Sequence, residues 1–154
     1  QKSCDQINTP DLKNIHTINL RGEGITKLKA GDFAGLKAVH TLDLSQNHIT
    51  NLSKELFQSL EGLKKLNLQN NKINTFYLSD TISQLLLQNN QIKNLEDINL
   101  TANSKLKDLY LSGNLIESIK KSDLALLREI RLLDISANNI KHIPENTFKD
   151  FFRD

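Results

Sequence analysis

The sequence of 154 residues is poor in several features that would define a function directly. Cys4 is the only cysteine, so no disulfide can form within the chain. No apolar run approaches the roughly 20 residues that cross a bilayer, so we expect nothing here to span a membrane. The chain carries 20 Lys and Arg against 18 Asp and Glu, without a basic block that would grip phosphates. We therefore expect no nucleic-acid partner.

Motifs for catalysis are also missing. The four histidines include no HExxH or similar metal-binding spacing. No GxSxG, P-loop or dinucleotide fingerprint occurs. The sequence predicts no enzyme, no cofactor and no metal site.

What the sequence does contain is an eleven-residue pattern that recurs six times. In Leu63–Ile73, LKKLNLQNNKI, apolar residues stand at positions 1, 4, 6 and 11, and asparagine stands at position 9. The copies begin at residues 15, 39, 63, 82, 106 and 130, so all are 24 residues apart except the third and fourth, which are 19 apart. One copy cannot bury its own apolar face, whereas stacked copies form a continuous core. The pattern therefore predicts a solenoid.

The segments between copies carry two further apolar columns, ten and thirteen residues after position 9. These columns contain Phe33, Phe57, Leu100, Leu124 and Phe148, then Leu36, Leu60, Leu127 and Phe151. The short linker after the third copy lacks both columns, and we expect Phe76, Tyr77 and Leu78 to cover that gap. The spacing favours helix and 3-10 turns equally.

Asparagine is suited to position 9 because its amide both donates and accepts hydrogen bonds. Buried at a tight turn, it can satisfy backbone groups of its own coil and of the neighbouring coil. We predict a structural ladder of these amides, with Glu23 replacing asparagine in the first copy: Asn47, Asn71, Asn90, Asn114 and Asn138.

The motif LxxLxLxxNxI, followed by an xxFxxL connector, resembles the extracellular leucine-rich repeat family with repeats of about 24 residues. The resemblance extends from about Leu12 to Phe151. It implies an α/β fold: a right-handed leucine-rich repeat solenoid with a parallel β-sheet on the concave face and short helical, 3-10 or irregular convex segments. The short spacing before the fourth repeat is similar to insect immune leucine-rich repeat proteins.

This resemblance also leads to predictions for the two ends of the chain. We expect an N-terminal cap segment over residues 1–14, six repeats over 15–154, and no C-terminal cap. Secreted members often carry several cysteines in the N-terminal cap, whereas here Cys4 stands alone. It is predicted to be either a free buried thiol or an intermolecular disulfide partner. The sequons at Asn51 and Asn99 are possible glycosylation sites and favour an extracellular location, secreted or at the cell surface.

Positions 3, 5, 7, 8 and 10 are predicted to face outward on the concave side. They are polar in the first three repeats, whereas the last three carry Leu86, Tyr110, Leu115 and Leu132. An exposed apolar patch with a tyrosine is typical of a protein contact site. With Lys65, Asp108 and Asp134 these residues form the predicted partner-binding set. Isolated exposed leucines are also common, and this end could instead pack on further repeats.

Two functional hypotheses follow. The first is a non-catalytic recognition module that binds a protein or glycoconjugate partner through the concave face, in adhesion or innate immunity, as the resemblance implies. The second is a structural component that forms homo- or hetero-oligomers through Cys4 or through the uncapped C-terminal end.

Overall fold

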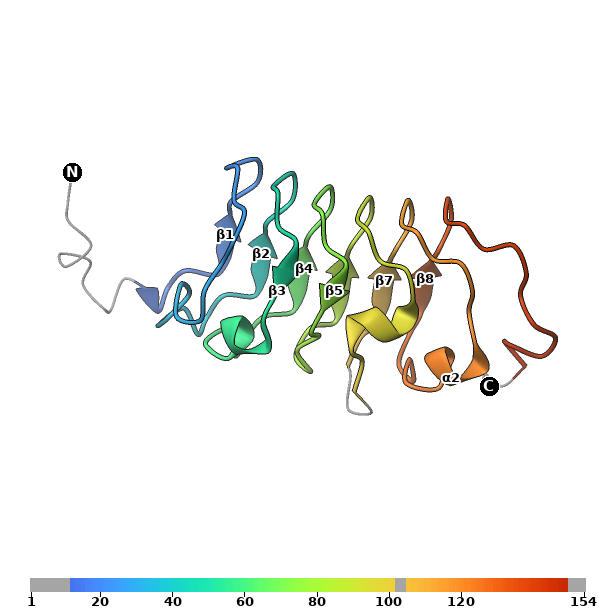
Figure 1. Cartoon of the computed structure of the whole chain (residues 1–154). Helices are drawn as coiled ribbons and strands as arrows, with labels where there is room; N and C mark the ends of the chain where they lie inside the picture. Colours follow the sequence, from blue (N-terminus) through green and yellow to red (C-terminus); the bar gives the residue numbers. More distant parts are fainter. Residues whose placement is uncertain (1–11, 102–104, 150–154) are drawn as a thin grey trace.

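A long parallel sheet runs through the described part of the chain (Figure 1). The computed structural model describes residues 12–101 and 105–149. The sheet contains six strands in the order β1-β2-β4-β6-β7-β8. Their bounds are β1 Thr17–Asn19, β2 Thr41–Asp43, β4 Lys65–Asn67, β6 Gln84–Leu86, β7 Asp108–Tyr110 and β8 Leu132–Asp134. The predicted solenoid with a parallel sheet is confirmed.

The opposite side of the solenoid is less regular. A second sheet pairs β3 (Asn51–Leu52) with β5 (Thr75–Phe76), and two 3-10 turns, η2 (Lys54–Phe57) and η3 (Leu95–Ile98), lie on the same side as helix α2 (Lys121–Leu124) (Figure 1). Both kinds of turn that the spacing allows are therefore present. Among the described residues, no helix has the length and apolar character needed to cross a membrane.

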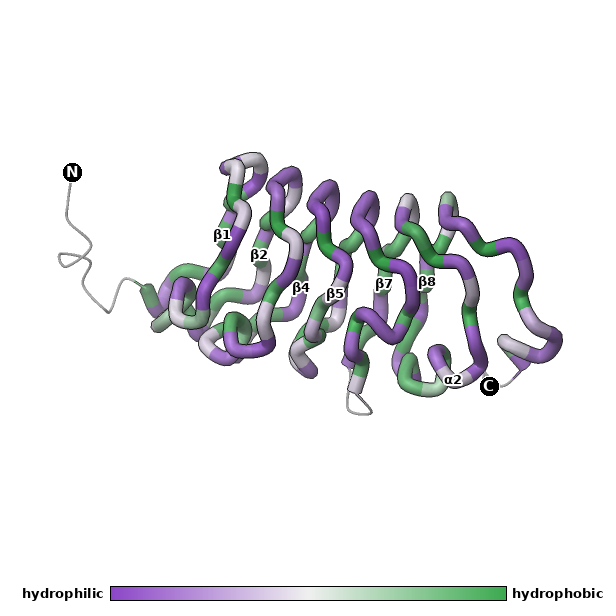
Figure 2. Tube along the Cα trace, viewed as in Figure 1, coloured by the Kyte–Doolittle hydropathy of each residue, from purple (hydrophilic) through white to green (hydrophobic). Residues whose placement is uncertain are grey.

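The core follows from the register of the strands. Position 4 of every repeat pairs with position 4 of the next, as in Leu42 with Leu66 and Leu85 with Leu109. Side chains alternate along a strand, so positions 4 and 6 point inward while positions 3 and 5 point outward. Hydrophobic residues accordingly recur at matching places along successive coils (Figure 2). Position 4 is fully buried from the second to the fifth repeat but only half-buried at Ile18 and Leu133, because within the described residues the outermost coils have one neighbour each.

The short third coil closes differently from the sequence-based prediction. Phe76 and Leu78 fill the gap, with exposures of 0% and 6%, whereas Tyr77 is 45% exposed. The prediction for Tyr77 was wrong because β5 places Phe76 inward, and alternation then turns the next side chain outward. Phe76 also packs edge-on against Phe57, with ring centroids 5.7 Å apart.

The position-9 asparagines join each coil to the coil before it. Nδ2 of Asn71 donates to the carbonyl oxygen of Leu68 in its own coil at 3.1 Å and to that of Leu44 in the preceding coil at 3.0 Å. Oδ1 of Asn71 accepts from the backbone N–H of Ile49 at 3.0 Å. The same three contacts recur at the other positions, formed by Asn47, Asn90, Asn114 and Asn138.

The turn before each of these residues has a left-handed backbone. Position 8 has positive φ in all six repeats, from 49° at Ala137 to 74° at Gly22. Only glycine adopts this conformation without strain. At Gly113 (φ 69°) an added Cβ would lie 2.2 Å from Oδ1 of Asn89, whereas at Gly22 it would meet nothing within 4 Å.

Asn71→Ala should lower the free energy of unfolding by about 1–3 kcal/mol, because buried carbonyl and N–H groups of two coils lose their partner. Asn138→Ala should cost less, since Asn138 is only half-buried and water can replace its amide. Urea denaturation of both variants measures the difference. An equal loss at the two positions would contradict burial as the cause.

Replacing Gly113 with alanine should destabilise the protein more than replacing Gly22. Both changes introduce left-handed strain of about 1–2 kcal/mol. Only at Gly113 must the Asn89 amide also move away from Oδ1 of Asn70, to which its Nδ2 donates at 3.0 Å. Thermal melts of the two variants provide the comparison, and a melting temperature lowered as much in Gly22→Ala would count against the clash.

Candidate binding surface

The outward side chains of β6, β7 and β8 form the candidate site. Strand register places Leu86 beside Tyr110, and Tyr110 beside Asp134. One position earlier, Gln84, Asp108 and Leu132 are partners in the same way. Adjacent strands lie about 4.8 Å apart, so paired side chains are in contact range and diagonal pairs are about 7–8 Å apart. Leu86, Tyr110 and Leu132 therefore form one continuous apolar track.

Position 5 has a local structural role in the other repeats. The side-chain oxygens of Asn19, Asp43, Asn67 and Asp134 each accept the backbone N–H of position 7 in the same repeat, at 2.9–3.1 Å. Such Asx-type bonds hold the turn that follows each strand. A leucine has no acceptor for this bond, and the hydroxyl of a tyrosine is too far along its side chain. Leu86 and Tyr110 thus occupy positions where the local backbone favours a different residue type.

The apolar track is accessible from solvent. Leu132 is 39% exposed, and Leu86 and Tyr110 are half-buried on the face of the sheet. Their neighbours at equivalent positions in the first three repeats are polar. A contiguous apolar strip across three strands is what a contact surface requires.

Two carboxylates border the track. Asp134 accepts hydrogen bonds from the hydroxyl and the backbone N–H of Ser136, at 2.7 and 3.0 Å. These bonds from Ser136 lower the pKa of the Asp134 carboxyl despite its partial burial, so the group is held as an anion. Asp108 accepts a longer bond of 3.4 Å from the amide of Gln84. The track thus lies between two acidic groups.

Gln88 contributes an unused acceptor next to the track. It stands two residues after Leu86 on the same face, and its Oε1 is buried without a hydrogen-bond partner. Among the described residues it is the only side-chain atom in that condition. Sequence reasoning missed both Gln84 and Gln88, and no signal in the sequence set Gln88 apart, because Gln69 occupies the same position 7 in the third repeat.

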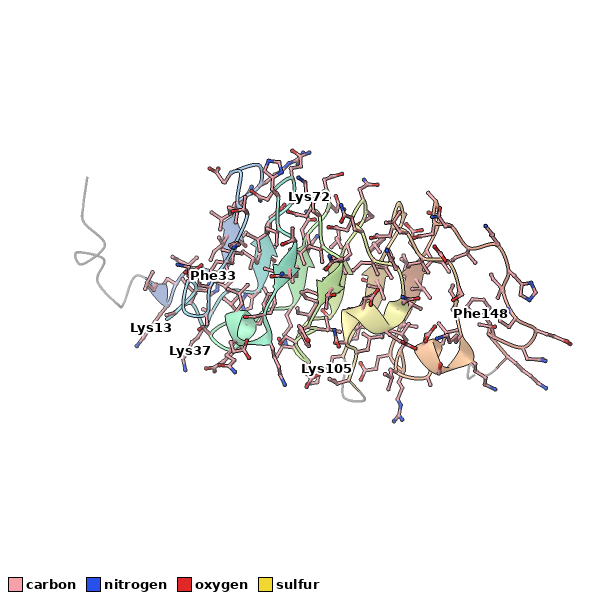
Figure 3. The ribbon with its side chains drawn as sticks, viewed as in Figure 1. Lys13, Phe33, Lys37, Lys72, Lys105 and Phe148 are labelled. Carbon is pink, nitrogen blue, oxygen red and sulfur yellow. The ribbon has the colours of Figure 1, made fainter. Side chains whose placement is uncertain are left out.

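Of the other predicted partner-binding residues, Lys65 borders the track, whereas Leu115 lies away from it. Lys65 is on β4, the strand before β6, and is exposed at its side. Leu115 follows Tyr110 by five residues, beyond the left-handed turn at Gly113. The equivalent residue of the third repeat, Lys72, lies at the turns past the ends of the strands (Figure 3). Leu115 is 38% exposed there, away from the sheet positions.

The two predicted glycosylation sites differ in accessibility. Asn51 is exposed on β3. Asn99 is half-buried, and its Nδ2 donates to the backbone carbonyls of Phe76 at 3.0 Å and Asp97 at 3.2 Å. Attachment of a sugar would compete with these bonds. Cys4, on which an intermolecular disulfide would depend, lies outside the described residues, as do Phe151 and most of the predicted N-terminal cap.

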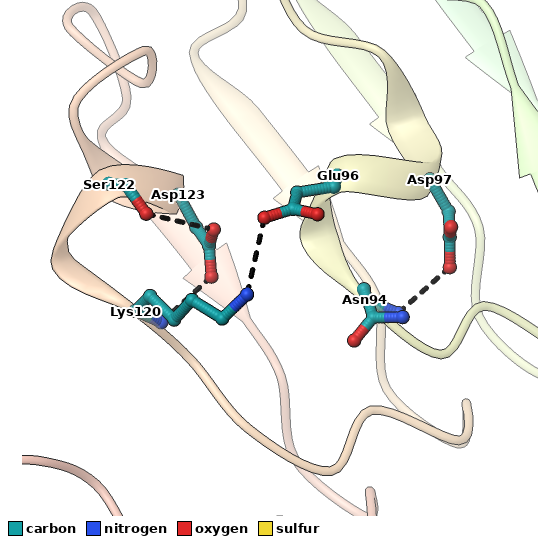
Figure 4. A network of polar contacts seen from close by, with 6 residues as sticks. All are labelled: Asn94, Glu96, Asp97, Lys120, Ser122 and Asp123. Carbon is teal, nitrogen blue, oxygen red and sulfur yellow. Dashed lines mark hydrogen bonds and ion pairs between the residues drawn. The ribbon is translucent and has the colours of Figure 1, made fainter.

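Two pockets lie outside the apolar track, and they are weaker candidates for a binding site. One of about 310 Å³ lies on the convex side between η3 and α2 and is lined by Leu95, Glu96, Asn99, Leu100, Ser122, Asp123 and Leu126. Its charged groups bond within the protein: Asp123 accepts the backbone N–H of Lys120 at 2.7 Å, and Glu96 pairs with the Lys120 ammonium at 3.3 Å (Figure 4). Another, of about 590 Å³, exposes the edge of the last coil at Leu133, Ile135 and Ile140.

His16 and His40 occupy position 2 of adjacent repeats and lie side by side. The rings of His16 and His40 stack with centroids 5.0 Å apart and planes 4° from parallel, and Nδ1 of His16 contacts the carbonyl oxygen of Ala38 at 3.0 Å. Within residues 12–101 and 105–149, no group of three or more His, Cys, Asp or Glu is placed to hold a metal ion.

Comparison with known proteins identifies the repeat. The family described as Leucine rich repeat matches residues 13–73 and 80–140, and a second model of the same description matches residues 62–85. No curated protein sequence matches the chain. Such repeat domains are typical protein-interaction modules.

Solved structures share the fold at low sequence identity. The LRIM1/APL1C complex contains a chain with a TM-score of 0.67 and 21% identity, and the match covers 88% of this chain and 32% of that one. The LRIM1 leucine-rich repeat domain gives the same TM-score and identity, with 88% and 49% coverage. The TLR13–ssRNA13 complex gives a TM-score of 0.64 and 18% identity, with 92% and 25% coverage.

The chain spans half or less of the length of these structures. The likeness to them therefore concerns the fold, whereas the family matches cover most of the sequence. On the recurring motif, the six-stranded parallel sheet and these matches, the chain belongs to the leucine-rich repeat family.

Proposed function

We propose that the protein is a recognition module that binds a protein partner through the apolar track of Leu86, Tyr110 and Leu132. The observation that carries this proposal is the exception at position 5. Four repeats use that position for an Asx-type bond to their own backbone, and the two that do not are neighbours on the exposed face. Local structure does not account for Leu86 and Tyr110, whereas a contact with another molecule does.

The surroundings of the track define the chemistry of the partner. Asp108 and Asp134 border it, so a complementary surface would present an apolar side chain beside a lysine or arginine. A rigid sheet makes such contacts with little rearrangement, which limits the entropic cost of binding.

The setting we propose is extracellular, secreted or at a cell surface, with a role in adhesion or immune recognition. The family resemblance and the exposed sequon at Asn51 support this location. Of the two sequons, we propose Asn51 as the glycosylated one, because the amide of Asn99 is bonded to Phe76 and Asp97.

The apolar side chains of the track can be replaced by residues that occupy the same positions in other repeats of this protein. A triple variant with Leu86→Asn, Tyr110→Asn and Leu132→Thr copies position 5 of the first repeat and position 3 of the second. We expect it to bind the partner at least tenfold more weakly while its melting temperature stays unchanged or rises, since asparagine can form the missing Asx-type bond.

The partner would be captured from extracellular fluid on the immobilised wild type, identified, purified and titrated against both proteins. Thr17→Ala with Thr41→Ala, on the polar part of the same face, is the matched control. Equal affinity of the wild type and the triple variant would refute the track as the site.

Asp134→Asn tests the predicted cation on the partner without disturbing the fold. Asparagine accepts the position-7 N–H at Asn19 and Asn67, so Ser136 keeps its backbone bond in the variant. We expect weaker binding and a smaller salt dependence, because one charge pair is lost.

The same change at Asp43 is a close control, since Asp43 bonds to Ser45 as Asp134 does to Ser136 but lies in the second repeat. The titrations are run at two salt concentrations. If Asp43→Asn weakened binding as much as Asp134→Asn, a local contact at the track would be ruled out.

A further inference from the structure

A second continuous line crosses the protein where the strands begin. The backbone N–H of position 2 in each repeat donates to the carbonyl oxygen of position 2 in the repeat before it, at 2.7–2.9 Å. Five such bonds connect the six residues His16, His40, Lys64, Ser83, Lys107 and Arg131. Neighbouring members are therefore about 4.8 Å apart, and the line is about 24 Å long.

Side chains at these positions project in a common direction. The parallel stack of His16 on His40 shows this for the first two repeats. His16, His40, Lys64 and Arg131 are exposed, and Ser83 and Lys107 are half-buried. We call these six residues the basic rail, because three of them are Lys or Arg and none is acidic.

Further cations surround the basic rail. Lys13, Lys37 and Lys105 project from this edge of the molecule, opposite the edge where Lys72 lies (Figure 3). We count charges over the four residues that end at position 2 in each repeat. Over all six repeats these residues include seven Lys and Arg and three Asp and Glu: Lys13, Lys37, Lys64, Lys105, Lys107, Arg128 and Arg131 against Glu61, Asp80 and Glu129. The edge is thus more positive than the whole chain, whose formal net charge is +2.

The cations of the basic rail are not neutralised by ion pairs. In the part of the chain that the structure describes, the ion pairs are Lys37 with Glu61 at 2.7 Å and Lys120 with Glu96 at 3.3 Å. Asp80 accepts a hydrogen bond from the Thr101 hydroxyl. Lys64, Lys107 and Arg131 are therefore available to an outside anion.

We propose that the basic rail binds a linear sulfated polysaccharide laid across the strands. The row has three cations, Lys64, Lys107 and Arg131, over four successive coils, and this spacing matches an extended chain with repeating anionic groups. Lysine and arginine bind such oxyanions by charge-assisted hydrogen bonds. Ser83 and the two imidazoles add polar hydrogen-bonding groups between and beside the charges.

The rail's composition distinguishes this partner from a single-stranded nucleic acid. Proteins that bind single strands combine a basic groove with aromatic side chains on which the bases stack. No Phe, Tyr or Trp occurs among the five residues that end at position 3 in any repeat. The rail thus offers charge contacts along a backbone but no surface for stacking.

The test uses the whole chain and a heparin oligosaccharide as the probe. In the rail variant, Lys64, Lys107 and Arg131 are replaced by glutamine. In the matched control, the exposed residues Lys27, Lys54 and Lys93, outside the rail, are replaced by glutamine, so both variants have the same net charge. Isothermal titration at several NaCl concentrations measures affinity and its salt dependence for all three proteins.

We expect the rail variant to bind heparin at least tenfold more weakly than the control variant in low salt. The slope of log K against log salt should fall in magnitude by about 2 to 3, because three ionic contacts are lost. Equal binding by the two variants would overturn the proposal, as would failure of the wild type to bind. A poly(dT) oligonucleotide of equal charge, bound as tightly as heparin, would overturn the assignment to a polysaccharide.

This inference does not depend on the apolar track. The track variant of the preceding subsection should bind heparin like the wild type, because its substitutions leave the basic rail unchanged. Loss of heparin binding in that variant would contradict the separation of the two surfaces.

Discussion

The fold depends on one repeated interaction, the amide of a buried asparagine shared between two coils. The carbonyl oxygen of Leu44 accepts from Asn47 and from Asn71, and the carbonyl oxygen of Leu68 accepts from Asn71 and from Asn90. Each of these carbonyls thus uses both of its lone pairs on adjacent coils. Because the amide can meet both requirements only when coils are in register, the ladder fixes the height of each strand relative to the next. Buried backbone groups would otherwise be left unpaired at considerable cost.

Fixed register turns sequence positions into columns on a surface. Residues one repeat apart become neighbours about 4.8 Å from each other, even across the shortened third coil, where Asn67 pairs with Leu86. The shortening is absorbed on the convex side, by β5 and the inward packing of Phe76, so the sheet stays continuous. A one-residue change in an outward position therefore alters the surface without altering the fold, which allows one scaffold to carry different contacts.

Sequence periodicity was sufficient to predict the sheet and the apolar residues on the outward face of β6 to β8. It could not predict the state of the connectors, because the 3-10 turn at Leu95–Ile98 and the helix at Lys121–Leu124 are each four residues long, too short for an apolar period to distinguish them. The exposure of Tyr77 and the position of Leu115 away from the track could not be predicted from the sequence either, because both depend on local changes of backbone direction. Likewise, the buried Oε1 of Gln88 depends on how neighbouring side chains pack around it.

The two surfaces that we propose lie on one sheet yet differ in charge. The track is bordered by Asp108 and Asp134, whereas the rail residues Lys107 and Arg131 precede Asp108 and Leu132 directly in the chain. Adjacent residues of opposite charge remain distinct because position 2 lies at the start of the strand and position 3 on its outward face. A cationic protein contact and an anionic polysaccharide are therefore not competitors for the same groups. Long-range attraction between the two ligands would instead favour their binding together, and salt would weaken that coupling over a Debye length of about 8 Å at physiological ionic strength.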